Sequence, residues 1–188
     1  MSVLKEIPLS NHLRVVLAAL IVAALMFAGC KGEEEYAEPD AFSFVVYPGA
    51  RYLGQLTEIT KSAHKVINPN QEPPPTAIYD TDAPVEQVAE YYAKEYGYSG
   101  VAPDATNNLS AAKPPAFYRT GDLAADTKAI EELLKRLNLP TDVSKATGMY
   151  KAAEIAPRPN RPRVVVQRPY FDSTTSQVVD RTLILMSR

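Results

Sequence analysis

RVVVQRPYFDSTTSQVVDRTLILM, residues 163–186, is the most strand-like stretch of the chain and decides how the rest is interpreted. Its β-branched and aromatic runs predict a β-hairpin in which Val164–Phe171 pairs with Gln177–Met186 around the five-residue connection Asp172–Ser176. Pro169 removes one backbone donor from the first arm. We therefore expect an edge position or a bulge at that proline.

A further strand and a helix come before this hairpin. Met149–Ile155 is a predicted strand, and Ala156–Pro162 is a proline-interrupted loop. Helical spacing of apolar residues predicts a helix over Ala83–Tyr96, with Asp82 as its N-cap and Gly97 as its left-handed C-terminal residue. The buried stripe of that helix comprises Val85, Val88, Ala89, Tyr92 and Tyr96.

A second helix is predicted over Leu123–Leu137. Asp122 or Asp126 lies near its start and Lys135-Arg136 lies in its last turn, so both charges complement the helix dipole. Its predicted buried face comprises Ile130, Leu133, Leu134 and Leu137. Between the two helices, Gly97–Tyr118 is rich in Pro, Asn, Ser and Ala, which indicates an irregular segment with at most one short strand.

The N-terminal half of the predicted domain is less regular. Aromatic and β-branched residues favour strands, and proline and glycine favour turns and loops. These patterns predict a strand over Phe42–Tyr47, a turn at Pro48-Gly49, a strand over Arg51–Ile67, a polyproline-like loop over Asn70–Pro75 and a short strand over Thr76–Asp80.

Predicted strands come before and after the two helices in the sequence, and most of these strands are joined by hairpins. This order indicates an α+β fold. We expect an antiparallel or mixed β-sheet with two helices packed on one face and a C-terminal β-hairpin. The only cysteine in the chain is Cys30, so no intramolecular disulfide is available and the stability must come from packing.

The first thirty residues have the pattern of a secretory signal. Lys5 and Arg14 precede an apolar run, Val15–Phe27, which is shorter than the roughly 20 residues that a spanning helix needs. The segment Phe27-Ala28-Gly29-Cys30 resembles the lipobox of bacterial lipoproteins. This resemblance implies cleavage between Gly29 and Cys30 and a lipid attached to Cys30. The alternatives are a cleaved soluble protein or a short membrane anchor.

This interpretation divides the chain into three parts. Residues 1–29 form the lipoprotein signal peptide, residues 30–41 an acidic tether, and residues 42–188 a single α+β domain. Glu33-Glu34-Glu35 and the lack of apolar mass indicate a solvated spacer between bilayer and domain. Lys31 follows Cys30 in place of the Asp that retains many lipoproteins in the inner membrane, which favours the outer membrane, facing the periplasm.

The predicted domain also resembles uncharacterised bacterial envelope lipoproteins. The similarity rests on short motifs: Tyr47-Pro48-Gly49-Ala50, Tyr79-Asp80-Thr81, the helix residues Pro84–Tyr92 and the hairpin Val164–Met186. It covers most of the mature chain except Gly97–Ile155. It carries no catalytic residue over to this sequence.

Candidate catalytic groups are few. His64 is the only histidine after residue 30, and no nucleophile elbow surrounds a serine. A formal net charge of -2 argues against a nucleic-acid partner. We expect no metal, no cofactor and no enzyme activity. The alternative is an envelope hydrolase that uses a carboxylate pair or Ser/His64 chemistry.

A cluster of arginines among prolines is the candidate binding site. Guanidinium groups on a stiff loop can bind carboxylate or phosphate in a bidentate manner. The alternative is a solvated charged loop. The candidate residues are Arg158, Arg161, Arg163 and Arg168. The sequence thus predicts a lipid-anchored envelope protein of non-enzymatic interaction or assembly type, with the membrane as one partner and an envelope protein or anionic ligand as another.

Overall fold

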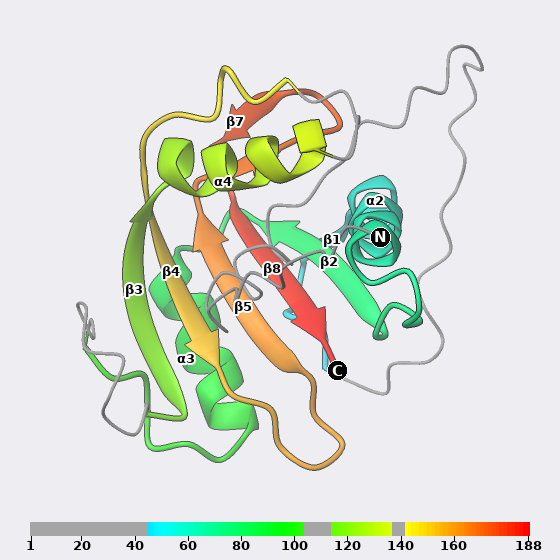
Figure 1. Cartoon of the computed structure of the whole chain (residues 1–188). Helices are drawn as coiled ribbons and strands as arrows, with labels where there is room; N and C mark the ends of the chain where they lie inside the picture. The colour runs from blue at the N-terminus through cyan, green and yellow to red at the C-terminus, as the bar shows by residue number, and fades with distance from the viewer. Residues whose placement is uncertain (1–44, 104–113, 137–141) are drawn as a thin grey trace.

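A six-stranded antiparallel sheet forms the centre of the molecule (Figure 1). The computed structural model describes residues 45–103, 114–136 and 142–188. Within them the strand order is β1-β2-β8-β5-β4-β3. The strands are β1 (Arg51–Tyr52), β2 (Thr76–Thr81), β3 (Ala116–Asp122), β4 (Met149–Ile155), β5 (Arg163–Arg168) and β8 (Thr182–Ser187).

The predicted C-terminal hairpin is present, but it is divided into two parts. β5 pairs with β8 in the central sheet, with Val164 opposite Met186 and Gln167 opposite Leu183. The pairing stops before Pro169, since proline has no N–H for the ladder. Beyond it, β6 (Tyr170–Asp172) and β7 (Gln177–Val179) form a separate two-stranded sheet. The prediction of one continuous strand over Val164–Phe171 is therefore wrong, because the chain leaves the central sheet at the proline.

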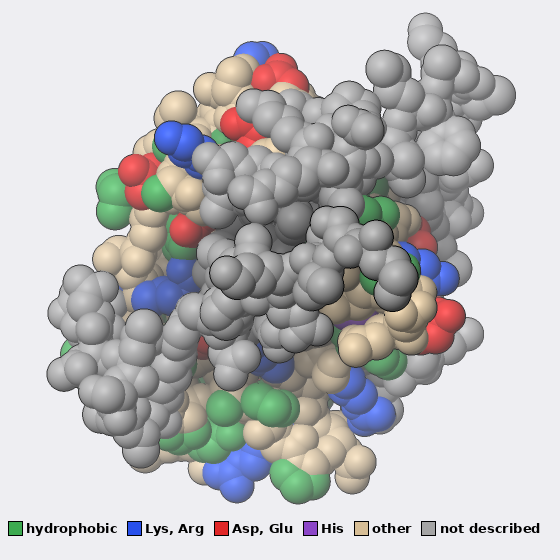
Figure 2. All heavy atoms as spheres, viewed as in Figure 1, with side chains coloured by type: hydrophobic (Ala, Val, Ile, Leu, Met, Phe, Trp, Pro, Cys, Tyr) green, Lys and Arg blue, Asp and Glu red, His purple; other side chains and the backbone are tan. Residues whose placement is uncertain are grey.

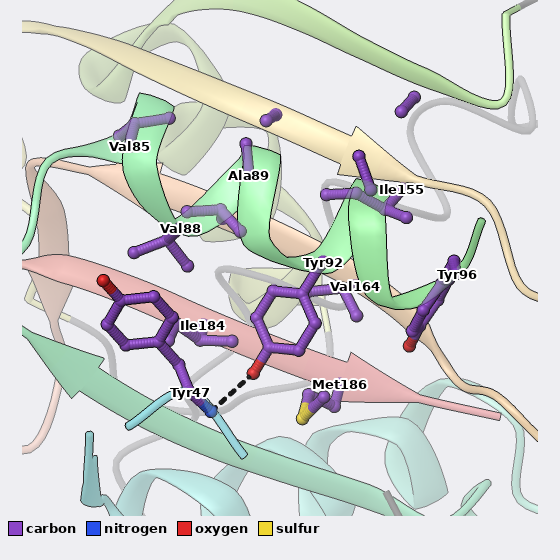
Figure 3. Packing of buried hydrophobic residues seen from close by; sticks show 14 of the residues in the cluster. Tyr47, Val85, Val88, Ala89, Tyr92, Tyr96, Ile155, Val164, Ile184 and Met186 are labelled. Carbon is purple, nitrogen blue, oxygen red and sulfur yellow. Dashed lines mark hydrogen bonds between the residues drawn. The ribbon is translucent and has the colours of Figure 1, made fainter. Parts of the chain in front are cut away.

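One helix, α3 (Val85–Glu95), covers the first face of the sheet. Its stripe of small and aromatic residues packs on alternate residues of four strands, as Figure 3 shows for Tyr92, Ile155, Val164 and Ile184. The predicted helix and its buried stripe are thereby confirmed. The predicted N-cap is wrong: Pro84 holds that position without a side-chain hydrogen bond, and Asp82 instead pairs with Arg181.

A helix also stands where a strand was expected. Most of Arg51–Ile67 forms α2 (Gly54–Ile67), and only Arg51–Tyr52 is a strand. The buried positions include Leu56, Thr57 and Thr60, which recur at helical spacing once threonine is counted as a buried residue. The hydroxyls of Thr57 and Thr60 donate to the carbonyls of Leu53 and Leu56, at 3.0 and 2.8 Å, so both polar groups are satisfied inside the helix.

The helices lie on both faces of the sheet. α2 packs on Ile78, Val165 and Leu185, which point away from α3 because successive strand residues alternate between faces. The start of α4 (Leu123–Arg136) packs on Tyr150 and Ala152, on the same side as α2. The two predicted helices, α3 and α4, thus lie on opposite faces, and the pair that shares a face is α2 and α4. The α+β class with an antiparallel sheet is confirmed.

Several predictions fall outside the described residues. These include the signal peptide with Gly29 and Cys30, the whole acidic tether over residues 30–41, and the apolar side chains assigned to the buried face of α4. Of the strand expected over Phe42–Tyr47, the structure describes Val45–Tyr47, which is not a strand. Among the helices that the structure describes, none combines the length and the hydropathy that crossing a bilayer requires.

Candidate functional site

The loop Ala156–Pro162 joins β4 to β5 and carries two of the four candidate arginines. Arg158 and Arg161 are the first and last residues of a tight turn, in which the Arg161 N–H donates to the Arg158 carbonyl at 2.9 Å. Pro159 supplies a fixed φ, and Asn160 has a left-handed φ of 61°. Proline followed by asparagine in these positions is typical of a type II turn. The sequence therefore builds a stiff turn with an arginine at each end.

Two tyrosines at the C-terminal end of α3 hold this loop. The Tyr96 hydroxyl donates to the Pro162 carbonyl at 2.8 Å, and the Tyr98 hydroxyl donates to the Ala156 carbonyl at 3.1 Å. The two acceptors lie at the opposite ends of the loop, so both of its ends are fixed to α3. Burial raises the pKa of Tyr96, which keeps its hydroxyl protonated and able to donate.

The end of α3 is itself set by Gly97. The N–H of Gly97 donates to the Lys94 carbonyl at 2.9 Å, and the N–H of Tyr98 donates to the Ala93 carbonyl at 2.8 Å. These two bonds and the φ of 71° at Gly97 define a Schellman motif, which confirms the predicted role of this glycine. The motif places Tyr96 and Tyr98 on either side of the glycine, facing the loop.

The two arginines stack on these two tyrosines. The guanidinium carbon of Arg158 lies 4.5 Å from the ring centre of Tyr98, and that of Arg161 lies 6.0 Å from the ring centre of Tyr96. Contacts of this kind hold a cation against the negative face of a ring. Arg158 is exposed and Arg161 is half-buried. Within the described part of the chain, no ion pair joins either arginine to a carboxylate.

A row of tyrosine rings continues from this site into the core. Successive ring centres lie 5.1 Å apart for Tyr47 and Tyr91, 5.2 Å for Tyr91 and Tyr92, and 6.3 Å for both Tyr92–Tyr96 and Tyr96–Tyr98. The Tyr92 hydroxyl accepts the Tyr47 N–H at 3.0 Å (Figure 3). Tyr91 and Tyr98 are partly buried against the core, so both rings contribute to packing.

The other two candidate arginines lie elsewhere. Arg163 donates to the Glu154 carboxylate from the neighbouring strand. Arg168, at the far end of β5, donates to Asp180 at 2.8 Å and to the Asp82 carbonyl at 2.9 Å. Five residues of strand separate the two arginines by about 17 Å. We therefore restrict the candidate site to Arg158 and Arg161 with Tyr96 and Tyr98, and call it the arginine–tyrosine surface.

A polar network that the sequence did not predict crosses the second face of the sheet. Glu154 accepts from Arg119 at 2.9 Å and also from Arg163, and the Tyr150 hydroxyl joins Arg119 to Asp126 on α4. Burial of Tyr150 raises its pKa to about 12. The network ties α4 to β3, β4 and β5.

A glycine on β3 makes room for this network. A β-carbon built at Gly121 would overlap the Tyr150 ring, so only glycine lets the ring lie across β3. Nothing in the sequence reveals this contact, because the two residues are 29 positions apart and meet only through the register in which Gly121 faces Tyr150.

A second network surrounds Asp80 on β2. This carboxylate is fully buried and accepts from Arg51 at 3.2 and 2.9 Å, from Arg181 at 2.9 Å and from the Tyr170 hydroxyl at 3.1 Å. Because its acceptor positions are filled by neighbouring side chains, Asp80 has a structural role, joining β1, β2 and β8 to the small β6–β7 sheet.

The residues of the alternative enzyme hypothesis are dispersed. His64 lies in the last turn of α2, and its buried Nδ1 has no hydrogen-bond partner among the described residues. Asp80 and Glu154, the buried carboxylates, are each bound by two arginines. On the face shown in Figure 2, acidic and basic side chains of the described residues are both scattered over the surface.

Comparison with protein-family models, with curated proteins and with solved structures finds no match to this chain.

Proposed function

We propose that this chain is a lipid-anchored, non-enzymatic protein of the bacterial cell envelope that binds an anionic group of a partner through the arginine–tyrosine surface. Its membrane attachment is the lipid at Cys30, as the lipobox-like segment implies. Its location is the outer membrane, facing the periplasm. The observation that carries the binding proposal is the stacking of Arg158 and Arg161 on two tyrosines, with no described carboxylate paired to either.

The chemistry of the surface favours a carboxylate or phosphate ligand. A guanidinium offers a planar set of N–H donors, and stacking against a ring leaves its edges free for bidentate bonds. The tyrosine hydroxyls donate to the loop carbonyls, so they fix the arginines without competing for the ligand. Because the turn is already rigid, little conformational entropy is lost when a ligand binds.

A labelled hexaglutamate peptide tests this surface. In the full-length protein, Arg158→Gln/Arg161→Gln should weaken binding of the peptide at least tenfold, measured by fluorescence anisotropy at low salt. The matched control is Lys128→Gln/Lys145→Gln, which removes the same charge from exposed positions elsewhere and should leave the affinity within twofold. Equal effects of the two double variants would show that net charge, and not this surface, governs binding.

Affinity capture from envelope extract then addresses the biological partner. The wild-type protein should retain a carboxylate- or phosphate-bearing component that Arg158→Gln/Arg161→Gln loses. Retention of the same components by both proteins would contradict a role for the arginine–tyrosine surface in partner binding.

A further inference from the structure

The chain itself carries an anionic segment shortly before the described residues begin. Residues 33–40, EEEYAEPD, contain five carboxylates and no basic side chain. The segment lies outside the described residues and is followed by only four more before Val45, where the described chain begins. Its charge is opposite to that of Arg158 and Arg161.

The described chain begins close to that surface. Tyr47 packs against Tyr91 and bonds to Tyr92, and Tyr92 lies one ring contact from Tyr96, on which Arg161 stacks. The path from Tyr47 to Arg161 is thus a short series of ring contacts along α3. A dozen extended residues, the distance from Glu33 to Val45, reach about 40 Å. The acidic segment can therefore reach both arginines.

We propose that the acidic segment 33–40 occupies the arginine–tyrosine surface of its own chain and that an outside anionic partner must displace it. The attraction between exposed charges is weak for each pair, on the order of 0–1 kcal/mol. However, attachment to the same chain gives the segment an effective concentration in the millimolar range. A segment–surface contact with a dissociation constant of about 1 mM or tighter is then enough to compete with a partner.

Displacement would also change how far the domain extends from its anchor, and this consequence rests on the proposed function. With the segment bound, the free chain after Cys30 is about three residues, or roughly 10 Å. With the segment released, the fifteen residues from Cys30 to Val45 reach about 50 Å. Partner binding would thus free the domain from a position close to the bilayer.

A comparison of matched charge variants tests the competition. In the full-length protein, Glu33→Gln/Glu35→Gln should tighten binding of labelled hexaglutamate about threefold to tenfold, as expected when a competitor at millimolar effective concentration is weakened. The control Glu58→Gln/Glu72→Gln makes the same change in net charge at exposed positions on and after α2. Equal affinities of the two double variants would overturn the proposal.

Zero-length cross-linking provides a readout that does not depend on the probe. Arg158→Lys/Arg161→Lys keeps the charges and supplies amines that a carbodiimide can couple to the carboxylates of residues 33–40. We expect cross-linked peptides that join the segment to the loop. The control variant Gln177→Lys, which places an amine on β7 instead, should give no cross-link to the segment. Absence of the segment–loop product would overturn the contact. If the product forms but hexaglutamate binds neither protein, the ligand proposal fails while the contact stands.

Discussion

Arginines bind both buried carboxylates of the described residues, Asp80 and Glu154. Asp80 and Glu154 each accept from two guanidinium groups, and removal of one partner from such a buried cluster leaves an uncompensated charge. At the scale of single residues, these clusters therefore hold the sheet and its helices together. Arg158 and Arg161 differ from these arginines in that they stack on tyrosines without a described carboxylate.

Asp80→Asn should be strongly destabilising, because it leaves Arg51 and Arg181 without their shared counter-ion. Breaking a fully buried pair costs about 3–5 kcal/mol, and we expect about 2–3 kcal/mol here because solvent screens the partly exposed arginines. The side chain of Arg51 is 66% exposed. Urea unfolding measures the change.

The control for this variant is Asp180→Asn. Asp180 is 82% exposed and pairs with Arg168 at the surface, so its loss should leave the unfolding midpoint unchanged. Equal midpoints for the Asp80 and Asp180 variants would contradict the structural role assigned to Asp80.

Tyr150 should make the stability of the fold depend on pH in the alkaline range. Burial raises its pKa from 10.0 to about 12. Because the folded state holds this proton more tightly, its contribution to stability is complete below pH 10 and is lost as the pH rises toward 12. Tyr150→Phe removes the ionisation, so the fall in urea midpoint from pH 8 to pH 11 should be smaller than in wild type. Tyr52→Phe is the control and should retain the wild-type fall.

At the scale of elements, the sequence predicted the helices and strands that have a clear local sequence pattern. α3 has an apolar stripe at helical spacing and a terminal glycine, and β4 and β8 are rich in apolar residues. α2 was missed because its buried face includes threonines, whose polarity hides the helical period until their hydroxyls are seen bonded within the helix. The face that each helix covers was not predictable, since it depends on strand order.

The candidate site was only partly predictable for the same reason. Proline spacing in the loop indicated that Arg158 and Arg161 are held on a stiff segment, and the structure brings them together. Their tyrosine partners come from the end of α3, about 60 residues earlier, and no local pattern connects the two segments. The pairing of Arg163 with Glu154 likewise depends on neighbouring strands.

Gly97→Ala tests how the end of α3 supports the binding loop. An alanine in the left-handed conformation costs about 1–2 kcal/mol, so we expect a loss of stability of that order. Since the Schellman motif orients Tyr96 and Tyr98, binding of labelled hexaglutamate should also weaken. Ser99→Ala, one residue beyond Tyr98 at an exposed position, should change neither quantity. Normal stability of Gly97→Ala would contradict the cap assignment.

At the scale of the whole molecule, two parts of the chain carry the proposed function. The described domain offers a preorganised cationic surface at one end of α3, and the residues before Val45 carry the acidic segment and the lipobox-like cysteine. An anchored protein searches for partners in two dimensions, so modest affinity is sufficient. The proposed surface therefore depends on the proposed anchor to find its partner at modest affinity.

Mass spectrometry of the N-terminal peptide of the protein isolated from bacterial membranes is the most direct test. We predict a peptide that begins at Cys30, carries a thioether-linked diacylglycerol and lacks residues 1–29. A protein that retains Met1–Gly29, or that begins elsewhere with an unmodified Cys30, would contradict the central claim of a lipid-anchored envelope protein.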